Sequence, residues 1–130
     1  MDNFKGTVIE ESLEDKNVLS KVKIVSTRIS QVTDEHQTPW LKQWTLHKVE
    51  IELSEVDNIA LQVSKSLDRE HGGSWYADFK NNVTHYVIYR DRVFKINRTK
   101  LDEYLEARKY GLGLGIPSHQ IDFEKDVVNK

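Results

Sequence analysis

Residues 74–97 constrain the fold of this chain most, because polar breaks divide them into three short segments with alternating apolar side chains. The expected strands are 74–80, 84–90 and 93–97. The breaks between them are Asn81-Asn82 and Asp91-Arg92. Alternation indicates strands, and breaks of two residues indicate tight hairpin turns. We call residues 74–97 the aromatic meander, because six of the twelve aromatic residues of the chain lie within it.

Three more strands and a helix are expected before the aromatic meander. Alternating apolar residues predict strands over 7–12, 21–33 and 43–53. A helix is expected from Ser54 to Leu67, because Ser54 is a favourable N-cap and apolar residues follow it at helical spacing. The buried face of this helix would carry Val56, Ile59, Ala60, Val63 and Leu67.

A second helix is expected after the aromatic meander, from a cap at Thr99 to a stop at Gly111. Its inner face would carry Leu101, Tyr104 and Leu105. Residues 112–130 are too irregular for a helix, since glycines and a proline interrupt their apolar residues. We therefore expect an extended C-terminal tail that packs as a cover and frays at its end.

The order of elements is three strands, a helix, three strands and a helix. This order favours an α+β domain with a mostly antiparallel sheet, and we expect both helices on one side of that sheet. Because the meander is apolar on both faces, its other face would need cover from the N-terminal strands, the tail or another subunit. No Gly- or Ser-rich tether interrupts the chain, so residues 1–130 are expected to form one domain.

The composition argues against several classes of function. With 19 Lys and Arg against 21 Asp and Glu, the net charge of -2 supplies no basic field, which disfavours nucleic acid as a partner. The absence of cysteine excludes disulfides, thiolate metal sites and cysteine nucleophiles. No apolar run approaches the length of about 18 residues that a membrane-spanning helix needs. We expect a cytoplasmic protein with no membrane partner, and the sequence implies no cofactor.

One polar row on the aromatic meander is the candidate catalytic site. Turns centred on the two breaks would place Asp78, His85 and Arg98 side by side across three strands. Asp78 would orient the imidazole of His85 as a general base, and Arg98 would hold a small anionic ligand. The alternative is a structural row of charges at the sheet margin, which contributes at most about 1 kcal/mol.

Two further groups of residues are candidate binding sites. In the first group, paired glycines in the loop before the meander let backbone N–H groups approach an anion. This group consists of His71, Gly72, Gly73, Trp75 and Tyr76. In the second group, Trp40 and Trp44 would lean to one face of a strand and line the mouth of a pocket. The alternatives are a simple turn at the glycines and closure of the core by the tryptophans.

The five histidines do not show the spacing of a metal site. None of them forms a two-ligand pair on one helix or on adjacent positions of a strand. A site assembled from distant residues, such as His47 and His85 with Asp78, stays open at this point.

These patterns leave three hypotheses about function. The first, which we favour, is a non-catalytic binding domain that forms a homo-oligomer through the aromatic meander and the region of Trp40 and Trp44. The second is a small enzyme for proton transfer or hydrolysis, in which His85 is the base. The third is a protein that stacks single-stranded nucleic acid on aromatic rings between basic side chains. The residues for this third function would be Trp75, Phe79, Tyr86, Arg90 and Lys95.

Overall fold

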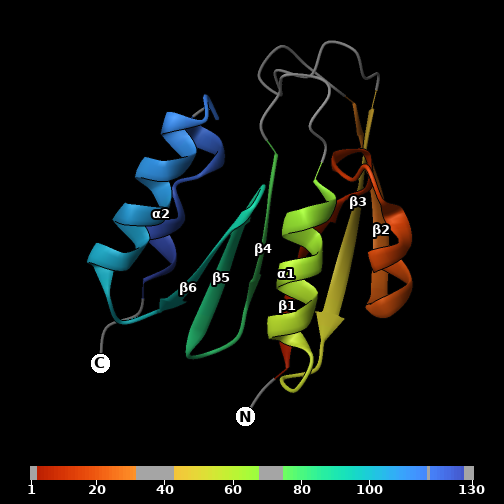
Figure 1. The fold of residues 1–130 in the computed structure, drawn as a ribbon, viewed down its shortest axis with the longest axis horizontal. Coiled ribbons are helices and arrows are strands. Elements are labelled where there is room, and N and C mark those ends of the chain that lie inside the picture. The colour runs from red at the N-terminus through yellow and green to blue at the C-terminus, as the bar shows by residue number, and fades with distance from the viewer. Residues whose placement is uncertain (1–2, 32–42, 68–74, 117, 128–130) are drawn as a thin grey trace.

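The structure is a computed structural model, and it describes residues 3–31, 43–67, 75–116 and 118–127 of the chain. Six strands, two α-helices and several short 3-10 helices (η) make up these residues (Figure 1). In chain order they are β1 (Phe4–Ile9), η1 (Glu10–Ser12), η2 (Lys16–Lys21), β2 (Lys23–Gln31), β3 (Gln43–Ile51), α1 (Val56–Ser66), β4 (Tyr76–Lys80), β5 (Thr84–Tyr89), β6 (Arg92–Asn97), α2 (Leu101–Gly113), η4 (Ser118–Gln120) and η5 (Phe123–Asp126).

The strands form one antiparallel sheet with the order β2-β3-β1-β4-β5-β6. The expected α+β class and the order of strands and helices are therefore confirmed. The first strand begins at Phe4 rather than at residue 7, and it lies between β3 and β4. Sequence patterns missed this start because Gly6 is a poor strand former. In the structure Gly6 is needed, since a Cβ there would overlap the backbone of Asp78.

One side of the sheet, which we call the α1 face, carries most of the core. Val56, Ile59, Ala60 and Val63 of α1 are buried, as their spacing predicts. They belong to one apolar cluster with the side chains of Phe4, Val8, Val49, Phe79 and Ile88. The N-cap of α1 is Glu55 instead of Ser54, and its side chain makes no capping hydrogen bond. Packing of the apolar face, and not the cap, therefore fixes this helix.

The second helix lies on the other side of the sheet, so the expectation that both helices share one side is wrong. Alternate residues of β5 separate into two clusters, with Tyr86 and Ile88 in the cluster of α1 and Val87 and Tyr89 in the cluster of α2. Successive side chains of a strand point to opposite faces, so α1 and α2 cover opposite faces. We call the second one the α2 face. The physical reason is that β5 is apolar on both faces and needs cover on both.

The C-terminal tail completes the cover of the α2 face. Its side chains Ile116, Ile121 and Phe123 are buried in the cluster of α2. Packing of the tail on the sheet was expected, but η4 and η5 interrupt its extended course. The helix continues past the expected stop to Gly113, and its N-cap is Lys100 instead of Thr99.

The helix α2 is also rotated relative to the expected one. Its buried residues are Tyr104, Ala107 and Gly111, whereas Leu101 and Leu105 are 49% and 45% exposed. The cause is close packing: a Cβ at Gly111 would lie 2.6 Å from the hydroxyl of Tyr89. That hydroxyl donates a hydrogen bond of 2.7 Å to the carbonyl oxygen of Ala107. Small residues are therefore required at positions 107 and 111 of the buried face, and Leu101 and Leu105 lie outside it.

Half of the α2 face has no cover among the described elements. Helix α2 and the tail pack over β4, β5 and β6, and the α2 face of β1, β3 and β2 is left open. We call this surface the open half-face. Its exposed or half-buried side chains include Lys5, Thr7, Lys23, Lys48 and Glu50. This half of the α2 face is polar, whereas the half that α2 covers is apolar.

Candidate functional site

The registers of both hairpins of the meander differ by two residues from the expected ones. Asp78 pairs with Val87, and His85 pairs with Ile96. The first turn moves forward by one residue, to Asn82 and Val83, because the Asn81 side-chain oxygen accepts hydrogen bonds from two backbone N–H groups, at 2.9 and 2.8 Å. In the second hairpin the turn moves back by one residue, and Asp91 adopts a positive φ of 58°. A shift by two keeps each side chain on its expected face.

Asp78 and His85 are in contact despite this shift, because they are diagonal neighbours on the α2 face. The distance from Nε2 of His85 to Oδ2 of Asp78 is 2.7 Å. The other ring nitrogen, Nδ1, lies 3.0 Å from the hydroxyl of Tyr104 on α2. A neutral imidazole satisfies both contacts when Nε2–H donates to the carboxylate and Nδ1 accepts from the phenol. The expected pair of Asp78 and His85 is thus part of a hydrogen-bond network that includes Tyr104.

Arg98 does not join this row. It lies one residue beyond β6, where its guanidinium donates hydrogen bonds to backbone carbonyl oxygens of Asn81 and Asp126. These bonds are 2.7 and 2.9 Å long. Arg98 is near Tyr104, and its charge opposes the effect of burial, which raises the pKa of Tyr104. The expected triad of Asp78, His85 and Arg98 is therefore not formed as one row.

Burial removes His85 from contact with solvent. Its side chain is 0% exposed, whereas that of Asp78 is 26% exposed. The ring of Phe123 from the tail lies over the imidazole edge to face, with centroids 5.6 Å apart. A general base must come within hydrogen-bond reach of its substrate. In this arrangement both ring nitrogens of His85 are already bonded, and the network holds β4, β5 and α2 together.

The aromatic rings of the meander are buried as well. Trp75, Phe79 and Tyr86 are 4%, 0% and 2% exposed, so they offer no surface on which bases could stack. Tyr86 donates a hydrogen bond to Asp57 of α1. Burial, and then this hydrogen bond, raises the pKa of Tyr86. The expected stacking surface is therefore part of the core beneath α1.

The other predicted binding residues separate into three groups. Trp44 packs against Trp75 with ring centroids 5.4 Å apart, and both are buried, so they close the core. Tyr76 donates a hydrogen bond of 2.6 Å to the backbone of Gln120, which fixes the tail. The remaining candidates lie outside the described residues, and they are Trp40, His71, Gly72 and Gly73.

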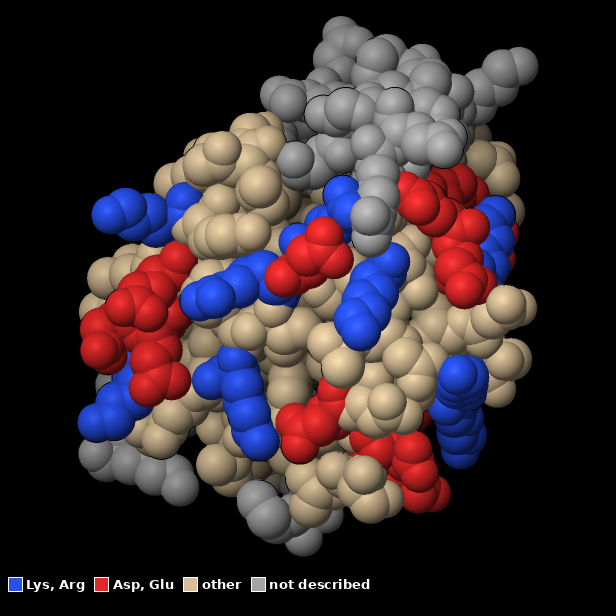
Figure 2. Space-filling model, in the orientation of Figure 1, with Lys and Arg blue, Asp and Glu red and all other residues tan. Residues whose placement is uncertain are grey.

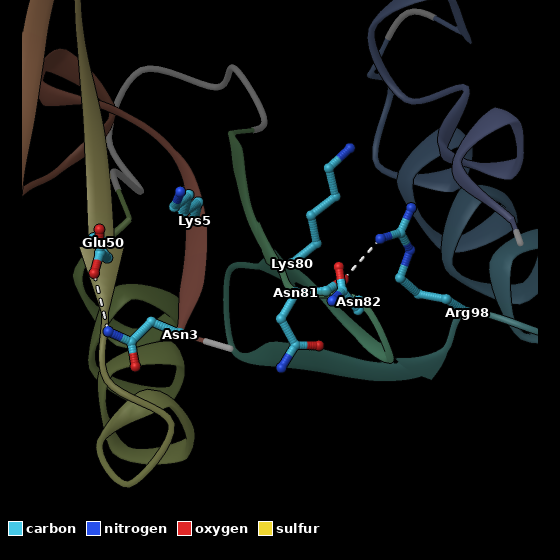
Figure 3. A pocket seen from close by; sticks show the side chains of 7 residues that line it. All are labelled: Asn3, Lys5, Glu50, Lys80, Asn81, Asn82 and Arg98. Carbon is cyan, nitrogen blue, oxygen red and sulfur yellow. Dashed lines mark hydrogen bonds between the residues drawn. The ribbon is translucent and has the colours of Figure 1, made fainter. Parts of the chain in front are cut away.

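The described clefts lie on the open half-face and at its border with β4, away from all these candidates except Arg98. One has a volume of about 460 Å³ and the other of about 330 Å³, and they share Lys5, Glu50 and Lys80. The first is lined by Asn3, Lys5, Glu50, Lys80, Asn81, Asn82 and Arg98 (Figure 3). Sequence reasoning missed this site because β1, β3 and β4 are distant in the chain. The available signal was the pair of charged residues Lys48 and Glu50 at alternate positions near the end of β3.

Glu50 is the carboxylate of this cleft, and Asn3 holds it with a hydrogen bond of 2.9 Å. This hydrogen bond, and next the charges of Lys23 and Lys5, lower the pKa of Glu50 below its usual value. We expect Asn3→Ala to raise the pKa of Glu50, because the hydrogen bond is the largest cause of the shift. An NMR titration of the Glu50 carboxyl measures this, and an unchanged pKa in Asn3→Ala would contradict the assignment.

Neither a metal site nor a membrane helix is present in the described part of the chain. No group of three or more His, Asp or Glu side chains there is arranged to hold a metal ion. His47 lies on the α1 face, where it bonds to Thr27 and Glu10, so it cannot share a ligand set with His85 on the opposite face. Among the described helices, none combines the length and the apolar composition that crossing a membrane requires.

The comparisons with known proteins give no further information about function, since no protein-family model, curated protein or solved structure matches the chain.

Proposed function

We propose that this protein is a non-catalytic binding domain that self-associates through the exposed leucines of α2. The observation that carries this proposal is a row of three leucines on the outer side of the helix. Leu101, Leu105 and Leu112 are 49%, 45% and 45% exposed. In a helix their spacing places them within an arc of about 40°. We call these three residues the leucine row.

The leucine row is separate from the packing face of α2. Tyr104, Ala107 and Gly111 already bury that face against the sheet and the tail. Figure 1 shows α2 at one flank of the molecule, where a partner has access to its outer side. Exposed apolar side chains that share one side of a helix are typical of protein contacts. The described part of the chain leaves the leucine row exposed, which supports contact with a partner protein.

The charges of α2 favour a second copy of this chain as the partner. The first half of the helix is acidic, with Asp102, Glu103 and Glu106, and the second half is basic, with Arg108 and Lys109. When two copies of α2 meet antiparallel about a two-fold axis, each acidic half faces a basic half. The same arrangement places Leu101 of one copy near Leu112 of the other. The charges of α2 and the positions of its leucines thus favour the same antiparallel arrangement.

The edge strand β2 is another exposed apolar surface among the described residues, and we consider it less suitable. Ile24, Val25 and Ile29 are 42%, 57% and 57% exposed on this strand. However, the pairing of β2 with β3 is irregular between Ile24 and Ser26, which indicates a β-bulge. The strand also carries Lys23 and Arg28. Bulges and cationic side chains are features that discourage pairing of sheet edges.

A non-catalytic role agrees better with His85 than an enzymatic one. An enzyme that uses this imidazole would have to open the contact with Phe123 and break one of two hydrogen bonds at the ring. A role in binding does not require access to His85. We also retain the cytoplasm as the proposed location, since it agrees with a chain that contains no cysteine.

The test is the molar mass in solution. We expect the wild type to form dimers reversibly at micromolar concentration, since three leucines supply only part of the area that a tight dimer buries. Leu105→Glu is expected to raise the dissociation constant by at least about tenfold, because it places a charge within the apolar contact. Light scattering after size exclusion, or sedimentation equilibrium, measures this change.

The matched control is Leu61→Glu on α1, because Leu61 is also exposed, at 49%, and lies on the other helix. We expect this variant to dimerise like the wild type. A wild type that stays monomeric over the whole micromolar range would refute self-association. Equal loss of dimer in Leu61→Glu and Leu105→Glu would place the contact elsewhere.

A further inference from the structure

We propose that the cleft of the open half-face binds the phosphate group of a small molecule between Lys5, Lys80 and Arg98. The side chains that line the cleft come from parts of the chain that are far apart in sequence (Figure 3). Lys5 belongs to β1, Lys80 ends β4, and Arg98 follows β6. The fold thus brings three cations to one cleft.

The sheet register places two of these cations directly opposite each other. Lys5 pairs with Lys80 across β1 and β4, and with Glu50 across β1 and β3. Directly paired side chains have Cβ atoms about 5 Å apart, and like charges in such a pair are destabilising. Glu50 is also paired with Lys23 on β2, so this one carboxylate serves two lysines. These paired positions carry three lysines and one glutamate, so positive charge exceeds negative charge among them.

The third cation is fixed in place without being neutralised by a carboxylate. Arg98 follows the last strand, and its guanidinium donates hydrogen bonds to the carbonyl oxygens of Asn81 and Asp126. Carbonyl groups orient a guanidinium but leave its full charge in place. The side chain of Asp126 pairs with Lys80 instead, at 3.0 Å. Among the described residues, no ion pair includes Lys5 or Arg98.

The neighbouring cleft adds a fourth cation to this surface. Lys48 lines it together with Lys5, Lys80 and the side chain of Thr7. Four cations thus surround the two clefts, against the carboxylates of Glu50 and Asp126. The opposite side of the molecule differs, because acidic and basic side chains are interspersed over the face shown in Figure 2. The cations around the two clefts therefore outnumber the carboxylates there.

A phosphate group fits this site better than a carboxylate. A phosphate monoester carries a charge of about -1.5 to -2 at neutral pH and presents three acceptor oxygens, which suits several cations at once. A carboxylate would compensate only one of them. The amide groups of Asn3 and Asn82 line the same cleft, and amides bind polar groups in either direction. A volume of about 460 Å³ lies within the range of small-molecule sites.

The test is an NMR titration of the wild-type chain with inorganic phosphate, adenosine monophosphate and adenosine at low ionic strength. We expect saturable shifts at the backbone amides of the cleft with both phosphates and none with adenosine. Tighter binding of the monophosphate would identify an organic phosphate as the ligand, and equal binding would identify free phosphate. Absence of saturable shifts with both phosphates, or equal shifts with adenosine, would refute the proposal.

Two pairs of variants separate the cleft from general surface charge. Lys5→Gln is expected to weaken phosphate binding by about tenfold, because it removes a charge-assisted hydrogen bond. The control Lys65→Gln removes an exposed lysine of α1 and should leave binding unchanged. Glu50→Gln should strengthen binding by several-fold, whereas Glu55→Gln, at the start of α1, should not. Equal effects within either pair would show that only the net charge matters, and would refute a site at the cleft.

Discussion

Replacement of Gly6 with alanine is expected to lower the free energy of unfolding by about 3 kcal/mol or more. Gly6 lies in β1, the strand that joins the two halves of the sheet, and it pairs with Val49 on one side and Phe79 on the other. A Cβ at this position would overlap the carbonyl group of Asp78 and lie 2.7 Å from a ring carbon of Phe79. The backbone of β4 cannot withdraw without loss of its pairing to β1.

The loss expected for Gly6→Ala is a large part of the free energy of unfolding of a domain, which is about 5–15 kcal/mol. Urea denaturation followed by tryptophan fluorescence measures it. The matched control is Gly113→Ala near the end of α2, where a Cβ would meet nothing within 4 Å. Because alanine is the better helix former, we expect this control to be neutral or more stable by up to about 1 kcal/mol. Wild-type stability of Gly6→Ala would refute the central position of β1.

Local periodicity explains why so much of the fold follows from the sequence. The buried positions Val56, Ile59, Ala60 and Val63 of α1 match their helical spacing. His47, Val49 and Ile51 of β3 are buried as their alternation predicts, at 8%, 1% and 3% exposure. Each of these patterns is a property of one element and needs no knowledge of its neighbours. The element types were therefore predictable.

The arrangement of neighbouring elements was predicted less well, because it depends on contacts between distant residues. Both hairpin registers shift by two residues, and the hydrogen bonds of the Asn81 side chain account for the first shift. This even shift preserves the faces of the strands, so the contact of Asp78 and His85 survives. Arg98 is lost from the row, because the shift of the second hairpin pairs His85 with Ile96 instead of Arg98. The periodicity of single elements also does not predict which side of the sheet α2 covers.

The candidate site shows the same limit. Lys5, Glu50 and Lys80 are separated by more than 25 positions along the chain, and only the pairing of three strands brings them together. Each is an ordinary charged residue of an amphipathic strand when it is considered alone. Their significance lies in the direct pairing of two lysines, which is a property of the register. Sequence reasoning instead selected mainly aromatic and histidine residues, and the structure places Trp44, Trp75 and His85 among them in the core.

The second large effect is expected for His85→Ala, which should lower the free energy of unfolding by about 3 kcal/mol. The substitution removes a fully buried ring and its hydrogen bonds to Asp78 and to the hydroxyl of Tyr104, which keeps only a longer contact of 3.4 Å to the carbonyl oxygen of Asp126. Tyr104→Phe removes only the hydroxyl group from this hydrogen-bond network, so we expect a smaller loss of unfolding free energy, of about 1–2 kcal/mol. The double variant should lose less than the sum of the two, because both substitutions remove one shared interaction.

The same measurement distinguishes the structural role of His85 from a catalytic one. Functional sites often carry strain, so their replacement tends to leave stability unchanged or to raise it. His47→Ala is the matched comparison, since His47 is also buried but bonds to Glu10, whose side chain is 36% exposed and can be hydrated. We expect a loss of about 1 kcal/mol for His47→Ala. If His85→Ala proves as stable as the wild type, the buried network is not structural, and the enzymatic hypothesis regains its support.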